Sequence, residues 1–188
     1  MEGFPAPLAI VSPRFCVPHA LRLTLTVTPT GGCTVTDAGG AMLLQMDPLF
    51  LRFRVHCRLL LDPAGRSVLT VKRKLLSILD RWDAFRGDSS NRCDLLFTAK
   101  KALVIQPGTH LDIFIASNTS QLVRDFRMMG SWNDRSWVLR RSNSSTVVAK
   151  MRRQYTVSGA LLGTRTFDLT VSPNVDYAFI AALVLVWD

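Results

Sequence analysis

The chain has 188 residues, close to the length of one domain, which disfavours two full domains. Hydrophobic residues make up 48% and charged residues 20%, so the composition provides a sizeable core and excludes intrinsic disorder over most of the chain. The 23 Lys and Arg residues exceed the 14 Asp and Glu residues, and the net charge of +9 favours acidic partners such as nucleic-acid phosphates or anionic lipid headgroups.

The first residues are rich in proline and contain no early lysine or arginine. Pro5, Pro7 and Pro13 interrupt a short apolar stretch, so the segment lacks the organisation of a secretory signal. We expect residues 1–10 to form a flexible N-terminal arm and residues 11–188 to form a single domain.

The cysteines indicate reduced thiols. They are far apart and form no CxxC pair, which argues against a zinc ribbon and against a redox-active dithiol. We therefore expect an intracellular protein that is cytoplasmic or peripheral at a membrane, with the nucleus as a further option. The four residues are Cys16, Cys33, Cys57 and Cys93.

Alternating apolar and polar residues predict strands that are buried on one face. Residues 21–28 alternate leucine or valine with arginine or threonine, and residues 52–57, 111–115 and 167–171 show the same period. Residues 70–80 fit either a strand or an amphipathic helix. The pattern predicts mainly antiparallel β structure, because turn-forming clusters separate the segments at 36–40, 62–65, 87–91, 117–120 and 142–145.

The longest apolar run, Tyr177–Trp187, is too short for a membrane-spanning helix, which needs about 20 residues. Its alanines favour a buried helix, whereas its valines leave a buried strand open, and we prefer the helix. Pro173 and Asn174 mark the start, with Asn174 as the expected cap and Asp176 at the positive end of the dipole. The expected core side chains are Tyr177, Phe179, Ile180, Leu183, Val184 and Trp187.

A helix that is apolar on every face must be enclosed by other elements. Many short strands and one such helix together predict a mainly β fold, in which a closed antiparallel β-barrel surrounds a central C-terminal helix. Closure of the barrel would also remove exposed strand edges.

The sequence offers no set of catalytic residues. It contains neither a GxSxG elbow nor an HExxH motif, and no glycine-rich loop of the GxGxxG or GxxxxGK[ST] type. His19, His56 and His110 are scattered, and adjacent strand residues such as His56 and Cys57 point to opposite faces. We therefore predict a protein that is not an enzyme, with no metal and no cofactor.

Clusters of basic residues are the feature with functional potential. In a strand, Lys72 and Lys74 share one face, as do Lys150 and Arg152, and such a pair can bind a headgroup phosphate. The alternative is a solvated outer face of the barrel. The candidate anion-binding or lipid-binding residues are Lys72, Arg73, Lys74, Lys100, Lys101, Arg140, Arg141, Lys150, Arg152 and Arg153.

Two of the tryptophans flank a predicted tight turn. Trp132 and Trp137 would form a cross-strand pair that closes the barrel end, joined by a turn at Asn133 and Asp134. We expect these aromatic rings to pack in the core. The alternative is that they stack on nucleic-acid bases beside nearby arginines.

Several segments resemble the LURP-one-related family of plants. They are TVKRKLLSILDRWDAFRGD (70–88), DFRMMGSWNDRSW (125–137) and SPNVDYAFIAALVLVWD (172–188), with SPRFCVP and TVTDAGGAML (34–43) upstream. The sequence departs from the family pattern at 42–46, where an aromatic residue is usual, and at its end, where members usually continue with a short polar tail.

The resemblance implies a tubby-like fold, in which a barrel of about twelve strands wraps around a hydrophobic C-terminal helix. Relatives of this fold include the phospholipid scramblases and the tubby proteins, which bind phosphoinositides and are described as membrane-tethered transcription regulators. Some members of the family itself are linked to plant defence.

The residues and the resemblance together predict a non-enzymatic tubby-like module. We expect it to dock on anionic phospholipids, phosphoinositides in particular, with a role in plant defence or signalling. The alternative is a nucleic-acid-binding transcription regulator tethered to a membrane. We expect a monomer without a transmembrane span.

Overall fold

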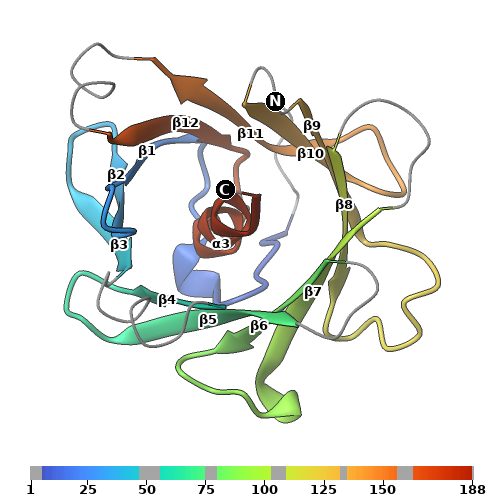
Figure 1. Cartoon of the computed structure of the whole chain (residues 1–188). Coiled ribbons are helices and arrows are strands. Elements are labelled where there is room, and N and C mark those ends of the chain that lie inside the picture. Colours follow the sequence, from blue (N-terminus) through green and yellow to red (C-terminus); the bar gives the residue numbers. More distant parts are fainter. Residues whose placement is uncertain are drawn as a thin grey trace.

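A computed structural model of the chain describes residues 6–46, 56–74, 80–102, 109–131, 135–155 and 163–187. The strands among these residues form one closed antiparallel barrel (Figure 1). Each strand pairs with its neighbours in sequence, and β1 pairs with β12 to close the barrel. The predicted closed barrel is therefore confirmed.

The barrel has twelve strands within the described residues. A short helix, η1 (Pro13–Phe15), precedes them, a second, η2 (Arg92–Asp94), lies between β6 and β7, and α3 (Tyr177–Trp187) follows them. The strands are β1 (Leu21–Val27), β2 (Cys33–Asp37), β3 (Met42–Met46), β4 (Cys57–Leu61), β5 (Ser67–Lys74), β6 (Arg81–Arg86), β7 (Leu95–Lys101), β8 (Thr109–Ile115), β9 (Phe126–Ser131), β10 (Ser136–Arg141), β11 (Val147–Gln154) and β12 (Arg165–Val171).

Helix α3 occupies the centre of the barrel, and its side chains form the middle of the core (Figure 1). Phe179 is fully buried, and its ring meets the edge of the Phe97 ring with centroids 5.0 Å apart. A large apolar side chain buried in this way stabilises the fold by about 1.5–3 kcal/mol. The predicted helix is confirmed and its strand alternative is wrong. Tyr177 is half-buried, whereas the other predicted core side chains of the helix are buried or nearly so.

The start of α3 is held by Asp176, a fully buried aspartate. Its Oδ1 accepts hydrogen bonds from the backbone N–H groups of Ala178 and Phe179, at 3.0 and 3.1 Å, as an N-cap does. The prediction that Asn174 caps the helix is wrong, since Asn174 lies before the cap in the left-handed region, with φ of 60°. Burial raises the pKa of the Asp176 carboxyl, and its four backbone hydrogen bonds oppose this effect.

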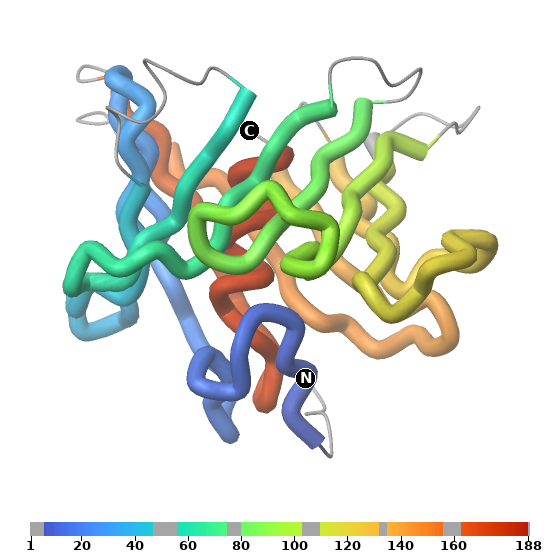
Figure 2. Tube along the Cα trace, turned by 90° about the horizontal axis from the view of Figure 1, so that it is seen from below, coloured from blue at the N-terminus to red at the C-terminus, as the bar shows by residue number. Residues whose placement is uncertain are grey.

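The same carboxylate holds the N-terminal segment. Its Oδ2 accepts from the backbone N–H groups of Val11 (2.7 Å) and Ser12 (3.0 Å), and Leu8 forms a bridge with Val175. Figure 2 shows this segment beside the start of α3, at one mouth of the barrel. The predicted arm, residues 1–10, lies partly outside the described residues, and its described part is in contact with the barrel at Leu8.

The end of α3 is capped from the barrel wall. Arg58 points inward from β4, and its Nη1 donates to the carbonyl oxygen of Leu185. The Arg58 guanidinium also lies 5.5 Å from the centroid of the Trp82 ring. A cation is favourable here because the carbonyl groups at a helix C-terminus carry partial negative charge.

Several sequence predictions have clear outcomes in the strands. The alternation at 21–27 corresponds to β1, whose leucines and valine face α3, and that at 111–115 corresponds to β8. Residues 70–74 belong to β5, which supports the strand interpretation there, and residues 75–79 lie outside the described residues. Residues 51–55 and the predicted turn with Trp132 also lie outside the described residues. Trp137 lies in the core, as predicted.

Gly130 on β9 lies close to the Trp187 side chain at the end of α3. A Cβ at this position would lie 2.7 Å from the Trp187 ring and 2.7 Å from the Ser136 carbonyl oxygen. We therefore expect Gly130→Ala to destabilise the fold by roughly 1–3 kcal/mol, because the ring or the strand must shift. Urea unfolding would measure this, with the exposed-turn variant Gly39→Ala as control. Coincident unfolding curves for Gly130→Ala and the wild type would contradict the prediction.

Candidate functional site

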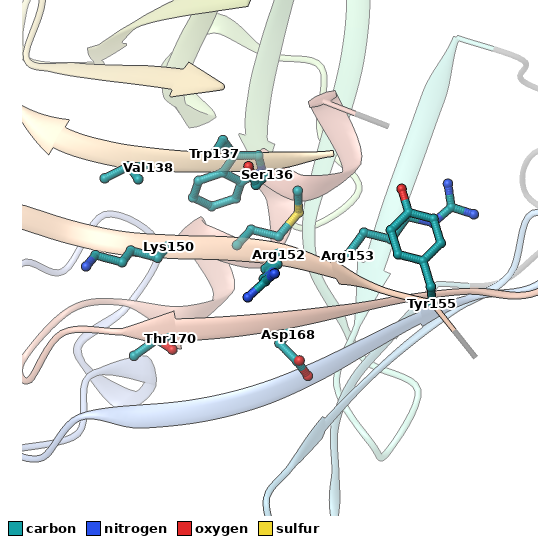
Figure 3. A pocket seen from close by; sticks show the side chains of 10 residues that line it. Ser136, Trp137, Val138, Lys150, Arg152, Arg153, Tyr155, Asp168 and Thr170 are labelled. Carbon is teal, nitrogen blue, oxygen red and sulfur yellow. The ribbon is translucent and has the colours of Figure 1, made fainter. Parts of the chain in front are cut away.

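A groove of about 730 Å³ lies on the outer wall of the barrel, over β10, β11 and β12 (Figure 3). Strand alternation creates it. On β11, Ala149 and Met151 face the core, so Lys150 and Arg152 point outward and are exposed. This is the shared face that the sequence predicted for the two cations. We call the surface formed by Ser136, Lys150, Arg152, Asp168 and Thr170 the outer groove.

The strand register places polar groups beside both cations. Lys150 lies opposite Thr170 of β12, and Arg152 lies between Ser136 of β10 and Asp168 of β12. Figure 3 shows these side chains on the same side of the three strands. A cation with a neighbouring hydroxyl group provides several hydrogen-bond donors for one phosphate.

Neither cation of the outer groove forms an ion pair within the described part of the chain. No carboxylate oxygen among the described residues lies within 4.0 Å of a side-chain nitrogen of Lys150 or Arg152. Asp168 instead accepts hydrogen bonds from the Gln154 amide, at 2.7 Å to each oxygen. The charges of Lys150 and Arg152 exceed that of Asp168 by one, so the outer groove presents a net positive charge to solvent.

A second hollow, of about 440 Å³, adjoins the outer groove across β12 and adds a third cation. Arg22 of β1 lies opposite Thr170, which in turn lies opposite Lys150. Sequence reasoning did not single out Arg22, because only barrel closure brings β1 beside β12. The sequence pattern indicated only that Arg22 lies on the outward face of the alternating segment 21–27.

Arg153 also lines the groove, together with Tyr155, but its side chain leaves the opposite face of β11 from those of Lys150 and Arg152 (Figure 3). Strand alternation turns it away from Lys150 and Arg152, and it is half-buried, with its guanidinium 5.0 Å from the centroid of the Tyr155 ring. Of the three cations of β11, only Lys150 and Arg152 therefore share the outward face.

The basic residues of β5 to β7 lie on another part of the outer wall, where carboxylates neutralise some of the charge. Lys74, Arg81 and Lys100 are cross-strand neighbours, and Arg81 pairs with Asp83 at 2.8 Å. Burial lowers the pKa of Lys100, and the charge of Arg81 lowers it further. Lys72 lies opposite Asp83 and 5.7 Å from the centroid of the Phe85 ring.

The remaining predicted cations lie at strand ends. Arg73 turns to the barrel rim, where it pairs with Asp80 and contacts the Trp82 ring, so it does not join Lys72 and Lys74. Lys101 is exposed at the end of β7. Arg140 and Arg141 end β10 on the side of the barrel that holds the N-terminal segment, and Arg140 Nη1 donates to the Ser145 carbonyl oxygen at 2.8 Å.

The described residues form neither a cluster of metal ligands nor a membrane-spanning helix. No three His, Cys, Asp or Glu side chains among them converge as a set of metal ligands. None of the helices in this part of the chain has the length and apolar character needed to cross a membrane.

The fold and the outer groove define a class of protein: a closed twelve-stranded antiparallel barrel around a central helix, with a basic groove on its outer surface. The family model described as LURP-one-related matches residues 22–188. The chain belongs to this family.

Curated relatives extend the match over nearly the whole chain. Protein LURP-one-related 15 of Arabidopsis thaliana is 40% identical, and the alignment covers 100% of this chain and 89% of that protein. Protein LURP1 of Arabidopsis thaliana is 37% identical over 96% of this chain and 88% of its own length. An X-ray structure of an Arabidopsis thaliana protein superposes with a TM-score of 0.73 at 35% identity, covering 94% of this chain and 95% of that one.

Proposed function

We propose that this protein is a non-enzymatic module that docks on anionic phospholipids through the outer groove and Arg22. The observation that carries the proposal is that Lys150 and Arg22, from two distant parts of the chain, lie on either side of Thr170, with Arg152 next along β11 opposite Asp168. Each cation near an anionic membrane surface contributes about 1 kcal/mol.

The groove favours a phosphate-bearing headgroup. Lys150 and Arg152 lie on β11 and Arg22 lies on β1, so the cations do not follow one long stripe. The hydroxyl group of Thr170 lies between Lys150 and Arg22, and that of Ser136 lies beside Arg152. We propose phosphoinositides as the ligands, because they present several phosphates on one small ring. The tubby-like relationship implied by the family resemblance supports this choice, and the proposed role in plant defence or signalling also comes from that resemblance.

Nucleic acid is the less favoured partner. Trp137, the described member of the predicted base-stacking pair, is only 1% exposed and is not available to a base. On the wall of β5 to β9, Asp83 and Asp112 interrupt the row of cations, which opposes contact with a continuous phosphate backbone.

Liposome flotation tests the proposal with charge-reversal variants. We expect the wild type to float with phosphoinositide-containing vesicles and not with neutral vesicles. Lys150→Glu combined with Arg152→Glu should weaken this binding roughly thirtyfold or more, since two attractive contributions of about 1 kcal/mol are lost and two repulsive charges are introduced. The control is Lys72→Glu with Lys74→Glu on β5, across the barrel from β11, which changes the net charge equally (Figure 1).

Two outcomes would contradict the proposal. One is equal recovery of the wild type with neutral and phosphoinositide-containing vesicles. The other is that the β5 control weakens binding as much as the β11 variant does, which would reflect net charge alone. Gel-shift measurements with duplex DNA at low salt test the alternative partner, and binding that falls steeply with salt would favour it.

A further inference from the structure

The loop between β8 and β9 presents two adjacent apolar side chains to solvent. Leu122 is 88% exposed and Val123 is 65% exposed. Single exposed leucines are common on protein surfaces and need no explanation. Leu122 and Val123, by contrast, are consecutive residues at a loop tip, and together they form an apolar projection.

Hydrogen bonds hold this loop in its projecting conformation. The Asn118 side-chain amide donates to the Val123 carbonyl oxygen (2.7 Å) and to Asp125 (2.9 Å), and its Oδ1 accepts from the Gln121 backbone N–H (3.1 Å). Asp125 also accepts from the Ile115 N–H at 2.9 Å. The exposure of the apolar pair therefore belongs to a preformed loop.

A cation, Arg141 at the end of β10, lies beside the apolar pair and lines one hollow, of about 380 Å³, together with Leu122 and Val123. Arg124, which follows the pair in sequence, forms an ion pair with Asp112 at 3.6 Å. A hydrogen bond from the Ser142 N–H to the Asp125 carbonyl oxygen, at 3.0 Å, ties the two loops together. Figure 2 shows them, in yellow and orange, on the same side of the barrel.

The pattern is that of a surface that enters a membrane interface, where apolar side chains reach the acyl boundary and flanking cations remain at the headgroups. Strand β10 connects it to the outer groove, since Ser136 at its start lines the groove and Arg141 at its end lines the loop hollow. The charge of Arg141 also matches the anionic headgroups that the outer groove is proposed to bind.

We propose that Leu122 and Val123 insert into the interface of an anionic bilayer and anchor the protein there, while Arg141 contacts the headgroups. This inference rests on the proposed function and deepens it, because it adds an apolar anchor to the electrostatic attraction of the outer groove.

Leu122→Gln combined with Val123→Gln tests the anchor without changing charge. We expect binding to anionic vesicles to weaken about tenfold or more, since the apolar contact is lost. The dependence of binding on salt should stay that of the wild type, because the cations remain. The matched control, Ala116→Gln with Thr119→Gln in the same loop, adds bulk at two other exposed positions and should bind as the wild type does. Unchanged melting temperatures would show that all variants are folded.

A fluorescent label reports insertion directly. We would place an environment-sensitive fluorophore at Leu122→Cys in a Cys93→Ser background, because Cys93 is the exposed native thiol and burial raises the pKa of Cys16 to about 11. Addition of anionic vesicles should shift its emission to the blue.

The outcomes separate the two proposals. The proposed anchor is wrong if the wild type binds anionic vesicles but the glutamine variant binds equally well, or if the label stays in a water-like environment. The proposal that the outer groove binds anionic phospholipids would still stand. If the wild type does not bind anionic vesicles at all, the proposed function and the anchor both fail.

Discussion

Ala182→Asp is expected to unfold the domain. Ala182 lies in the middle of α3 and is fully buried, enclosed by the barrel on all sides. An aspartate there would bury a charge with no partner and would also exceed the available space, at a cost of about 5 kcal/mol or more. Domains of this size have a total stability of about 5–15 kcal/mol, so one such change removes much or all of it.

Circular dichroism would follow the thermal transition of this variant. The control is Ala20→Asp, at an exposed position before β1, which should melt as the wild type does. An unchanged melting temperature for Ala182→Asp would mean that α3 is peripheral, in conflict with the enclosed helix.

Substitution of Asp176 should have the second largest effect. In Asp176→Ala, four backbone N–H groups lose their acceptor, two in the first turn of α3 and two at Val11 and Ser12. Removal of this cap and of the link to the N-terminal segment should cost roughly 3–5 kcal/mol, although the cost of burying the carboxylate is also removed. Urea unfolding would measure the loss.

Asp176→Asn separates the two roles of the carboxylate. Its remaining oxygen can still accept from Ala178 and Phe179, but its NH₂ group would face the N–H groups of Val11 and Ser12. We expect a smaller loss of stability than for Asp176→Ala, with faster hydrogen exchange at Val11 and Ser12 and little change in the first turn of α3. Equally faster hydrogen exchange at Val11 and Ser12 and in the first turn of α3 would contradict this division of roles.

Much of the fold was predictable from local pattern. The period of two in residues 21–27 identified the inward face of β1, and the same rule placed Lys150 and Arg152 together on the outer face of β11. The start of α3 was predicted less accurately. Asn174 and Asp176 are both good capping residues, and the choice between them depended on the backbone, which places Asn174 in the left-handed region before the helix begins.

The candidate site was predicted only in part. Sequence proximity grouped Lys72, Arg73 and Lys74, yet alternation sends Arg73 to the rim and Asp83 lies opposite Lys72. It also left out Arg22, which lies far in sequence from Lys150. Pairing across strands, which depends on the register of the whole barrel, determines which charges meet and which are neutralised.

The sequence by itself determined that an apolar helix had to be enclosed and that the excess charge had to lie on the outside, because both follow from the cost of exposing apolar groups and of burying charged ones. Only the tertiary structure decided where the charge converges. Closure of β1 against β12 brings Arg22 beside Thr170 and Lys150, and the Gln154 amide donates to both oxygens of Asp168, the carboxylate opposite Arg152. These are contacts between distant segments, and no local pattern specifies them.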